Sequence, residues 1–140
     1  MIRALSQADM ELAHQCIQEV ETRFPNDPQG RKVYGGLCHS FPILVRTCGL
    51  CQALAFHEDK ATEASKPRGQ AHGLLLDHIA RLLGIEGRQA LLRHVREDSG
   101  ITDYMRDTRR VLAAWIYWKR FAVSILKVKD ARDAEDGADA

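Results

Sequence analysis

Residues 41–59 read FPILVRTCGLCQALAFHED, and their apolar side chains point in nearly every direction when the stretch is wound as a helix. A helix that is apolar on all sides is a buried one, so this segment predicts the central helix of a bundle. Ser40 supplies an N-cap side chain, and Pro42 falls in the first turn, where its missing N–H costs no hydrogen bond. Gly49 costs ~1 kcal/mol relative to Ala in mid-helix, which indicates that a neighbouring element approaches closely there.

The rest of the chain repeats the spacing of amphipathic helices, and no stretch alternates apolar and polar residues over the length of a strand. The other predicted helices cover residues 4–24, 31–39, 71–83, 87–96 and 101–128, with a polar connection at 60–70. The sequence therefore predicts an all-α fold. We expect a single compact bundle of about six helices, with one central apolar helix and a long C-terminal helix.

Basic character is concentrated in the second half of the chain. The 140 residues carry a net charge of +1, but residues 67–129 hold twelve basic and six acidic side chains, a net charge of +6. Residues 130–140 hold five acidic residues, one basic residue and no apolar residue larger than Ala. We assign residues 1–129 to one helical domain, because a chain of this length buries a core of its own. We expect residues 130–140 to be a disordered acidic tail.

Several classes of protein are excluded by composition and motif. The longest apolar run, Val111–Trp118, is far shorter than the ~20 residues that span a bilayer, so we expect no membrane partner. The N-terminus has no signal-peptide core, which predicts a cytoplasmic protein with reduced thiols. There is no phosphate-binding glycine loop, no G-x-S-x-G motif and no H-E-x-x-H motif. We therefore expect no enzyme, no cofactor and no small-molecule substrate.

Cys48-Gly-Leu-Cys51 is a C-x-x-C motif, which is typical of redox pairs and of half a zinc site. Cys38, His39 and His57 flank it and complete a possible set of ligands. The motif lies within the predicted apolar helix, without the turn that presents zinc ligands, and no second C-x-x-C is present. We interpret the cysteines as small buried thiols and predict no metal, with a thiol or zinc protein as one alternative.

A second alternative is a helix-turn-helix DNA-binding regulator that uses residues 79–96, where two predicted helices flank Gly84. Arg93 stands at a position that is normally apolar in that motif, because it locks the second helix onto the first. The basic residues of this unit are Arg88, Arg93 and Arg96.

The last predicted helix carries a basic row beside its core stripe. Guanidinium groups along a helix, with an aromatic ring among them, favour contact with a phosphate backbone and occasional base stacking. The candidate residues for contact with RNA or with a complex are Arg106, Arg109, Arg110, Tyr117, Lys119 and Arg120. Ile116 and Val123 lie among these charges, which indicates a surface for a partner protein.

The order of several segments resembles that of a known family. These segments are Tyr34, Phe41-Pro42-Ile43, Gly49-Leu50, Ala53-Leu54-Ala55-Phe56, Lys60, Tyr104 and Trp118-Lys119-Arg120-Phe121-Ala122, with Gln7 in the first helix. Over residues 3–128 the chain resembles the small α-helical subunit of Cmr-type (type III-B) CRISPR effector complexes, which cleave RNA under the direction of a guide RNA. The stretch 60–100 departs most from the family pattern.

This resemblance implies a non-catalytic subunit in antiviral defence. Small subunits of the family stack on one another and along the backbone subunits, beside the groove that holds the guide–target duplex. The implied partners are therefore other subunits of the complex, copies of this chain, and guide and target RNA. Sequence in such complexes is read by base pairing, so the protein needs only to hold backbone and shape.

Overall fold

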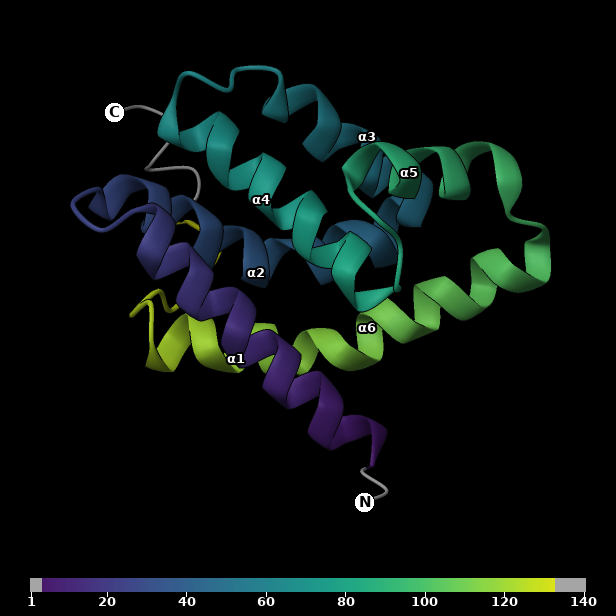
Figure 1. Ribbon diagram of the computed structural model, residues 1–140, viewed down its shortest axis with the longest axis horizontal. Coiled ribbons are helices and arrows are strands. Elements are labelled where there is room, and N and C mark those ends of the chain that lie inside the picture. The colour runs from purple at the N-terminus through teal and green to yellow at the C-terminus, as the bar shows by residue number, and fades with distance from the viewer. Residues whose placement is uncertain (1–3, 133–140) are drawn as a thin grey trace.

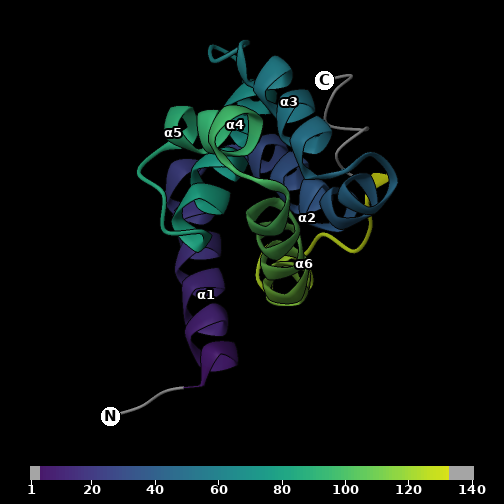
Figure 2. The same ribbon diagram turned by 90° about the vertical axis from the view of Figure 1, so that its right-hand side faces the viewer.

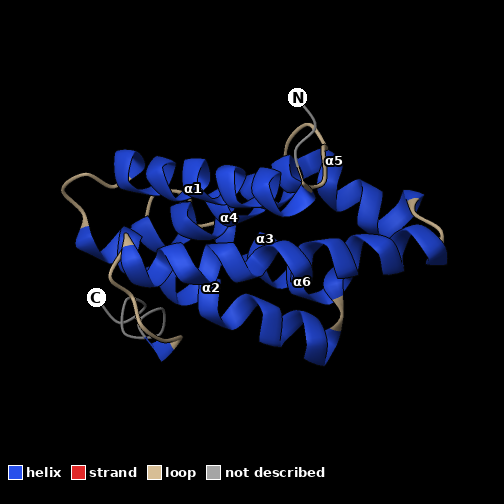
Figure 3. Ribbon diagram, turned by 90° about the horizontal axis from the view of Figure 1, so that it is seen from below, coloured by secondary structure: helices blue, strands red, loops and turns tan. Residues whose placement is uncertain are grey.

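Every regular element of residues 4–132, the part of the chain that this computed structural model describes, is helical (Figure 1). Figure 3, coloured by secondary structure, shows helices and loops and no strand in that part. The elements are α1 (Leu5–Arg23), α2 (Pro28–Cys48), α3 (Leu50–Ala61), α4 (Pro67–Leu82), α5 (Arg88–Arg93), the π-helical turn η1 (His94–Asp98) and α6 (Ile101–Ser124). The predicted all-α bundle with a long C-terminal helix is confirmed.

Two helices, α2 and α4, occupy the centre of the bundle. Helix α2 packs against α1, α3, α4 and α6, and α4 packs against α1, α2, α3 and α5. Figure 2 shows α2 between an upper group formed by α3, α4 and α5 and the long helix α6 below. Residues 71–76 of α4 are all buried, because neighbouring helices surround them.

The predicted central helix over residues 41–59 is wrong, because the chain breaks at Gly49. This glycine has φ +88°, a left-handed conformation that costs a residue with a Cβ of order 1 kcal/mol or more. Its N–H donates to the carbonyl of Val45 at 2.8 Å and closes α2, while its carbonyl accepts from Ala53 and opens α3. The Tyr104 hydroxyl of α6 accepts from the Cys51 N–H at 3.0 Å and holds the break in place. The glycine therefore separates two helices instead of weakening one.

The predicted boundary at Ser40 is also wrong, since α2 continues through Pro42. Asp27 caps the helix, and its Oδ1 accepts from the N–H groups of Gln29 and Gly30. Pro42 has no N–H to donate to the carbonyl of Cys38, one turn earlier. That buried carbonyl instead accepts from the Trp115 indole N–H of α6 at 2.8 Å. A tertiary hydrogen bond thus replaces the one that proline removes, and the helix does not need to end.

Because the predicted helix is split in two, several of its apolar residues are more exposed than expected. Leu50 is fully buried, but Phe56 is 43 % exposed and Ile43 is 60 % exposed. The interpretation of the stretch as apolar on all sides and buried therefore holds for only part of it. Ile43, Leu44 and Phe56 line a pocket between α2, α3 and α4.

The predicted end of the last helix at residue 128 is corrected to Ser124. Lys127 has φ +63°, which turns the chain back across α2. Val128 is buried, and a Cβ on Gly35 of α2 would lie 2.5 Å from its side chain. The His39 imidazole and the Val128 carbonyl are hydrogen-bonded at 2.8 Å. Close packing on a glycine therefore decides this boundary.

Three smaller expectations have mixed outcomes. The predicted helix over residues 87–96 divides into α5 and η1, and the polar connection shrinks to residues 62–66. Of the predicted disordered tail, residues 130–132 are described as structure, and residues 133–140 lie outside the described residues. None of the helices described is both long and apolar enough to cross a membrane.

Candidate nucleic-acid interface

Helix α6 is amphipathic, and its two sides differ sharply. One side buries Val111, Ala114, Trp115, Trp118 and Ala122 in the core. The Trp115 and Trp118 rings lie parallel, with centroids 4.8 Å apart, in the core. Helices α1 and α2 cover the flanks of α6, which leaves one continuous strip of the helix open to solvent.

Three of the six predicted contact residues stand on this open strip with unneutralised charge. Arg109, Lys119 and Arg120 are exposed, and none of them forms an ion pair within residues 4–132. Arg109 and Arg120 are eleven residues apart, about three turns and about 16 Å along the axis, so they share one face. Such a spacing suits contact with several phosphates of one strand.

Arg106 lies on the same open side, but its charge is partly satisfied. Its guanidinium donates to an Asp103 carboxylate oxygen at 2.6 Å, one turn earlier on α6. Both side chains are at least half exposed, so solvent screens the pair and a stronger anion can displace it. Arg106 therefore stays available to a phosphate.

Arg110 is turned into the bundle and is not part of the open strip. Its Nη1 and Nη2 donate to the two carboxylate oxygens of Asp9 on α1, at 2.6 and 2.5 Å. Asp9 is only 5 % exposed, and the Arg110 side chain is 26 % exposed. The sequence carried a signal for this pair: Asp9 interrupts the apolar stripe of α1 between Leu5 and Ala13, where a carboxylate needs a partner. This contact joins α1 to α6.

Tyr117 faces α1 and not the open strip. It lines a groove of about 740 Å³ together with Met10, His14 and Phe121. The His14 and Phe121 rings meet edge to face, with centroids 5.3 Å apart. The Tyr117 ring, which was predicted to lie among the basic residues, is therefore half buried beside α1.

Apolar side chains do stand among the charges of the open strip. Ile116 is 58 % exposed and Val123 is 42 % exposed, as the sequence indicated, and Met105 is exposed on the same side. A strip that mixes large apolar groups with cations is unusual for a surface that only meets water. It fits a surface that meets both protein and nucleic acid.

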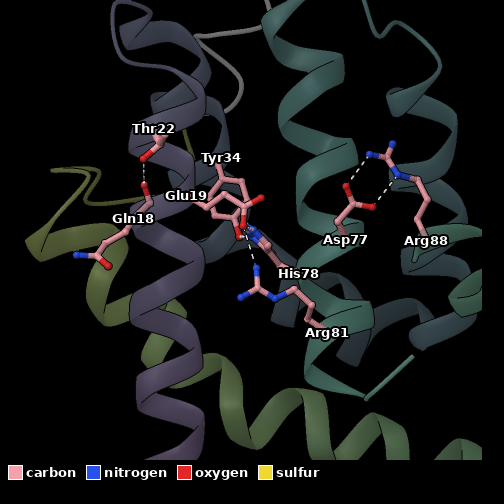
Figure 4. Close-up of polar contacts among 8 residues, drawn as sticks. All are labelled: Gln18, Glu19, Thr22, Tyr34, Asp77, His78, Arg81 and Arg88. Atoms are coloured by element: carbon pink, nitrogen blue, oxygen red, sulfur yellow. Dashed lines mark hydrogen bonds and ion pairs between the residues drawn. The ribbon is translucent and has the colours of Figure 1, made fainter. Parts of the chain in front are cut away.

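The helix-turn-helix interpretation of residues 79–96 is not supported by the geometry. Helix α5 has only six residues, and η1 follows it directly, so no full recognition helix forms. Arg88 is bound to Asp77 through two hydrogen bonds of 2.9 and 2.8 Å (Figure 4). A DNA-reading role for Arg88 would first have to break this bidentate pair.

The cysteines do not converge on a metal site. Cys48 ends α2 and is exposed, Cys51 lies past the helix break, and Cys38 is buried. The flanking imidazole of His57 is bonded to His72. Within residues 4–132, no group of three or more His, Cys, Asp or Glu side chains is arranged to hold a metal ion. The absence of bound zinc stays a prediction.

A buried polar row joins α2, α4 and α1. The Tyr34 hydroxyl and His78 Nδ1 are 2.5 Å apart, and Glu19 lies 3.4 Å beyond His78 Nε2 and accepts from Arg81 at 2.9 Å (Figure 4). Burial raises the pKa of Tyr34, and burial lowers the pKa of His78 to about 4 although Glu19 opposes this. The hydroxyl therefore keeps its proton and is hydrogen-bonded to a neutral imidazole. Because Tyr34 and His78 are fully buried, this end of the row holds α2 against α4 in the core, while Glu19 and Arg81 extend it to the surface.

Comparison with known proteins gives the family. A family model described as "CRISPR-associated protein (Cas_Cmr5)" matches residues 5–125, a range that includes every helix of the bundle. The chain belongs to the Cmr5 family. A Thermus thermophilus protein described as "CRISPR system Cmr subunit Cmr5" is 32 % identical to it over 126 residues, which cover 90 % of this chain and 99 % of that protein.

A solved Cmr5 structure has the same fold. The crystal structure of a CRISPR-associated Cmr5 family protein from Thermus thermophilus superposes with a TM-score of 0.72 at 33 % sequence identity. The match covers 88 % of this chain and 98 % of the other. The resemblance that the sequence showed is therefore confirmed as membership of the Cmr5 family.

Proposed function

We propose that this chain is a non-catalytic structural subunit of a CRISPR RNA-guided, RNA-targeting effector complex, and that the open strip of α6 faces guide and target RNA. The observation that carries the proposal is the exposed set of Arg109, Lys119 and Arg120, whose charges no ion pair satisfies within the described part of the chain. Membership of the Cmr5 family supports the assembly, because a relative is described as a Cmr subunit.

The six predicted contact residues have two different roles in this proposal. Arg106, Arg109, Lys119 and Arg120 contact RNA or neighbouring subunits. Arg110 acts indirectly: through Asp9 it fixes α1 against α6 and so sets the shape of the strip. Tyr117 belongs to the α1–α6 groove and supports that same joint.

The isolated chain should bind RNA weakly. Each neutralised phosphate of a single strand contributes about −0.7 to the slope of log K against log salt, so three contacts give a slope of about −2. That term alone gives little affinity at physiological salt. Copies of the chain that stack along the complex would present the same strip repeatedly, and linked contacts on one strand multiply the retention of RNA.

Charge reversal on the strip tests this function. In the reconstituted complex, Arg109→Glu, Lys119→Glu and Arg120→Glu together should reduce target-RNA retention at least tenfold while helicity stays unchanged. The matched control reverses three exposed arginines elsewhere, at positions 23, 93 and 96, with the same change in net charge. Its RNA retention should stay near that of the wild type.

Two results would refute the proposal. One is full RNA retention by a correctly assembled strip variant. The other is guide-independent RNA cleavage by the isolated wild-type chain, which would make it an enzyme. Loss of binding in the control alone would move the nucleic-acid site to η1 and its neighbours.

A further inference from the structure

A second surface lies away from α6, where α2, α3, α4 and Ala131 of the C-terminal segment line a cavity of about 360 Å³. No residue of α6 lines it. Leu37, Ile43, Leu44 and Phe56 form its walls, and Ile43 and Phe56 are two of the exposed large apolar residues of the chain. Their exposure leaves apolar surface in water that the fold itself does not cover.

Two buried histidines that line the cavity carry nitrogen atoms with no hydrogen-bond partner among residues 4–132. His57 and His72 are bonded through their Nδ1 atoms at 2.8 Å, and both side chains are 1 % exposed. Burial lowers the pKa of His57 to about 3 and of His72 to about 4, so both imidazoles are neutral at pH 7. One Nδ1 must then donate and the other accept, which leaves one Nε2 protonated and one Nε2 with a lone pair. Neither Nε2 has a hydrogen-bond partner among residues 4–132.

Arg68 lines the cavity and Lys60 lies beside its Phe56 wall, and neither cation has an acidic partner among the described residues. The Nε of Arg68 lacks a hydrogen-bond partner in the described part of the chain. Lys60 lies over the Phe56 ring, with its Nζ 5.7 Å from the ring centroid. No carboxylate of the described residues forms an ion pair with either cation. Buried or half-buried cations of this kind favour an acidic group from outside the fold.

We propose that this cavity docks a segment of a different subunit of the effector complex, which inserts one large aliphatic or aromatic side chain and places a carboxylate against Arg68 and Lys60. The inference rests on the proposed function, because it assumes that the chain belongs to an effector complex. It adds the surface through which the chain binds another subunit of that complex. A buried apolar anchor in a pocket, with charge pairs at its edge, is the usual arrangement of a binding hot spot.

Other occupants fit the cavity less well. RNA would need a row of cations, whereas Arg68 is the single charged residue that lines this cavity, beside Leu37, Ile43, Leu44, Phe56 and uncharged polar side chains. Residues 133–140 of the chain read DAEDGADA and have no side chain large enough to fill an apolar cavity. A second copy that docked through its α6 strip would bring arginines toward Arg68 and Lys60, and like charges would repel.

The assembly of the purified subunits tests the docking surface. The double variant Ile43→Ser with Phe56→Ser should join the complex with a dissociation constant raised at least tenfold, as expected when an anchor pocket is lost. The matched control is Leu5→Ser with Ile101→Ser, which removes two exposed apolar side chains elsewhere and should join normally. Ile43→Ser alone covers the case in which loss of the Phe56 ring disturbs the fold, and it should still weaken assembly.

A photocrosslinker identifies the occupant. p-Benzoylphenylalanine at position 43, in the intact complex, should attach to a peptide of another subunit that carries a large apolar residue next to Asp or Glu. Replacing that acid by Lys should weaken assembly, and Arg68→Glu should restore it. Crosslinks to RNA, to residues 133–140 or to a second copy of the chain would overturn the inference.

The two proposals fail in distinguishable ways. If the wild-type chain does not enter the complex at all, the proposed function is wrong. If the wild type enters and the Ile43/Phe56 variant enters with the same dissociation constant, only the docking inference is wrong.

Discussion

The buried pair of Asp9 and Arg110 gives the sharpest prediction, because the chain also contains an exposed pair of similar length. The perturbation is Asp9→Asn, which removes the negative charge and keeps the shape of the side chain. Arg110 would then remain among α1 and α6 residues without a counter-ion. The matched control is Asp103→Asn, which breaks the Arg106 pair of 2.6 Å on the open strip.

The expected magnitudes follow from burial. Removing one partner of a fully buried ion pair costs about 3–5 kcal/mol, because an uncompensated charge is left behind. Since a quarter of the Arg110 side chain is exposed, water can reach part of the guanidinium, and we expect a loss of about 2 kcal/mol for Asp9→Asn. The Asp103 pair is at least half exposed on both sides, so its loss should cost less than about 0.5 kcal/mol.

Urea unfolding followed by circular dichroism at pH 7 measures both free energies. A double variant, Asp9→Leu with Arg110→Met, should recover most of the lost stability, because apolar groups of similar size need no partner. Equal losses of the free energy of unfolding for Asp9→Asn and Asp103→Asn would show that the Asp9–Arg110 pair is not buried as described. A double variant no more stable than Asp9→Asn would show the same. RNA retention by the complex should be unchanged in the double variant, since the apolar pair keeps α1 packed against α6 and Arg110 itself lies off the open strip.

Three further outcomes are expected. Trp115→Phe should cost about 1–3 kcal/mol in urea unfolding, because the carbonyl that Pro42 leaves unpaired loses its indole donor, and the cost should shrink in a Pro42→Ala background. Leu50→Ala should cost about 2–5 kcal/mol and Phe56→Ala distinctly less, since Leu50 is fully buried and Phe56 is 43 % exposed; equal losses would contradict the assigned burial. The three buried histidines have pKa values lowered to about 3 or about 4, so below pH 6.5 the unfolded chain binds protons that the folded chain does not. The free energy of unfolding should therefore fall as pH drops from 6.5 toward 4, by up to about 1.4 kcal/mol per pH unit for each histidine, and stability that is independent of pH in this window would refute their burial.

Local signals in the sequence predicted α1 and the start of α6 closely. These signals are the prolines after α1, the apolar stripe of α6 and the glycines before α5. Each depends only on residues within one or two helical turns, so the sequence is enough to predict its effect. Family membership was also readable, because the order of short motifs survives where single residues change. The open strip of α6 was predicted in part: Ile116, Val123 and four of the five predicted cations are exposed as expected.

The errors share a different origin. Pro42 stays inside α2 because the Trp115 indole donates to the carbonyl of Cys38, seventy-seven residues earlier in the chain, and no rule that considers only neighbouring residues can predict such a contact. A glycine at position 49 could lie within a closely packed helix or could adopt a positive φ that ends one helix and starts another. The hydrogen bond from the Cys51 N–H to the Tyr104 hydroxyl forms only with the second arrangement. In both cases residues remote in sequence decide between conformations of similar local energy.

The sequence alone determined that this protein is a helical bundle of the Cmr5 family with a basic second half, since periodicity, capping and motif order are properties of the chain itself. Only the tertiary structure decided which charges are free. Arg109 and Arg110 are neighbours in sequence and equal in chemistry, yet one meets solvent and the other meets Asp9. The 100° between successive helical residues separates them, and which direction is covered depends on where α1 packs.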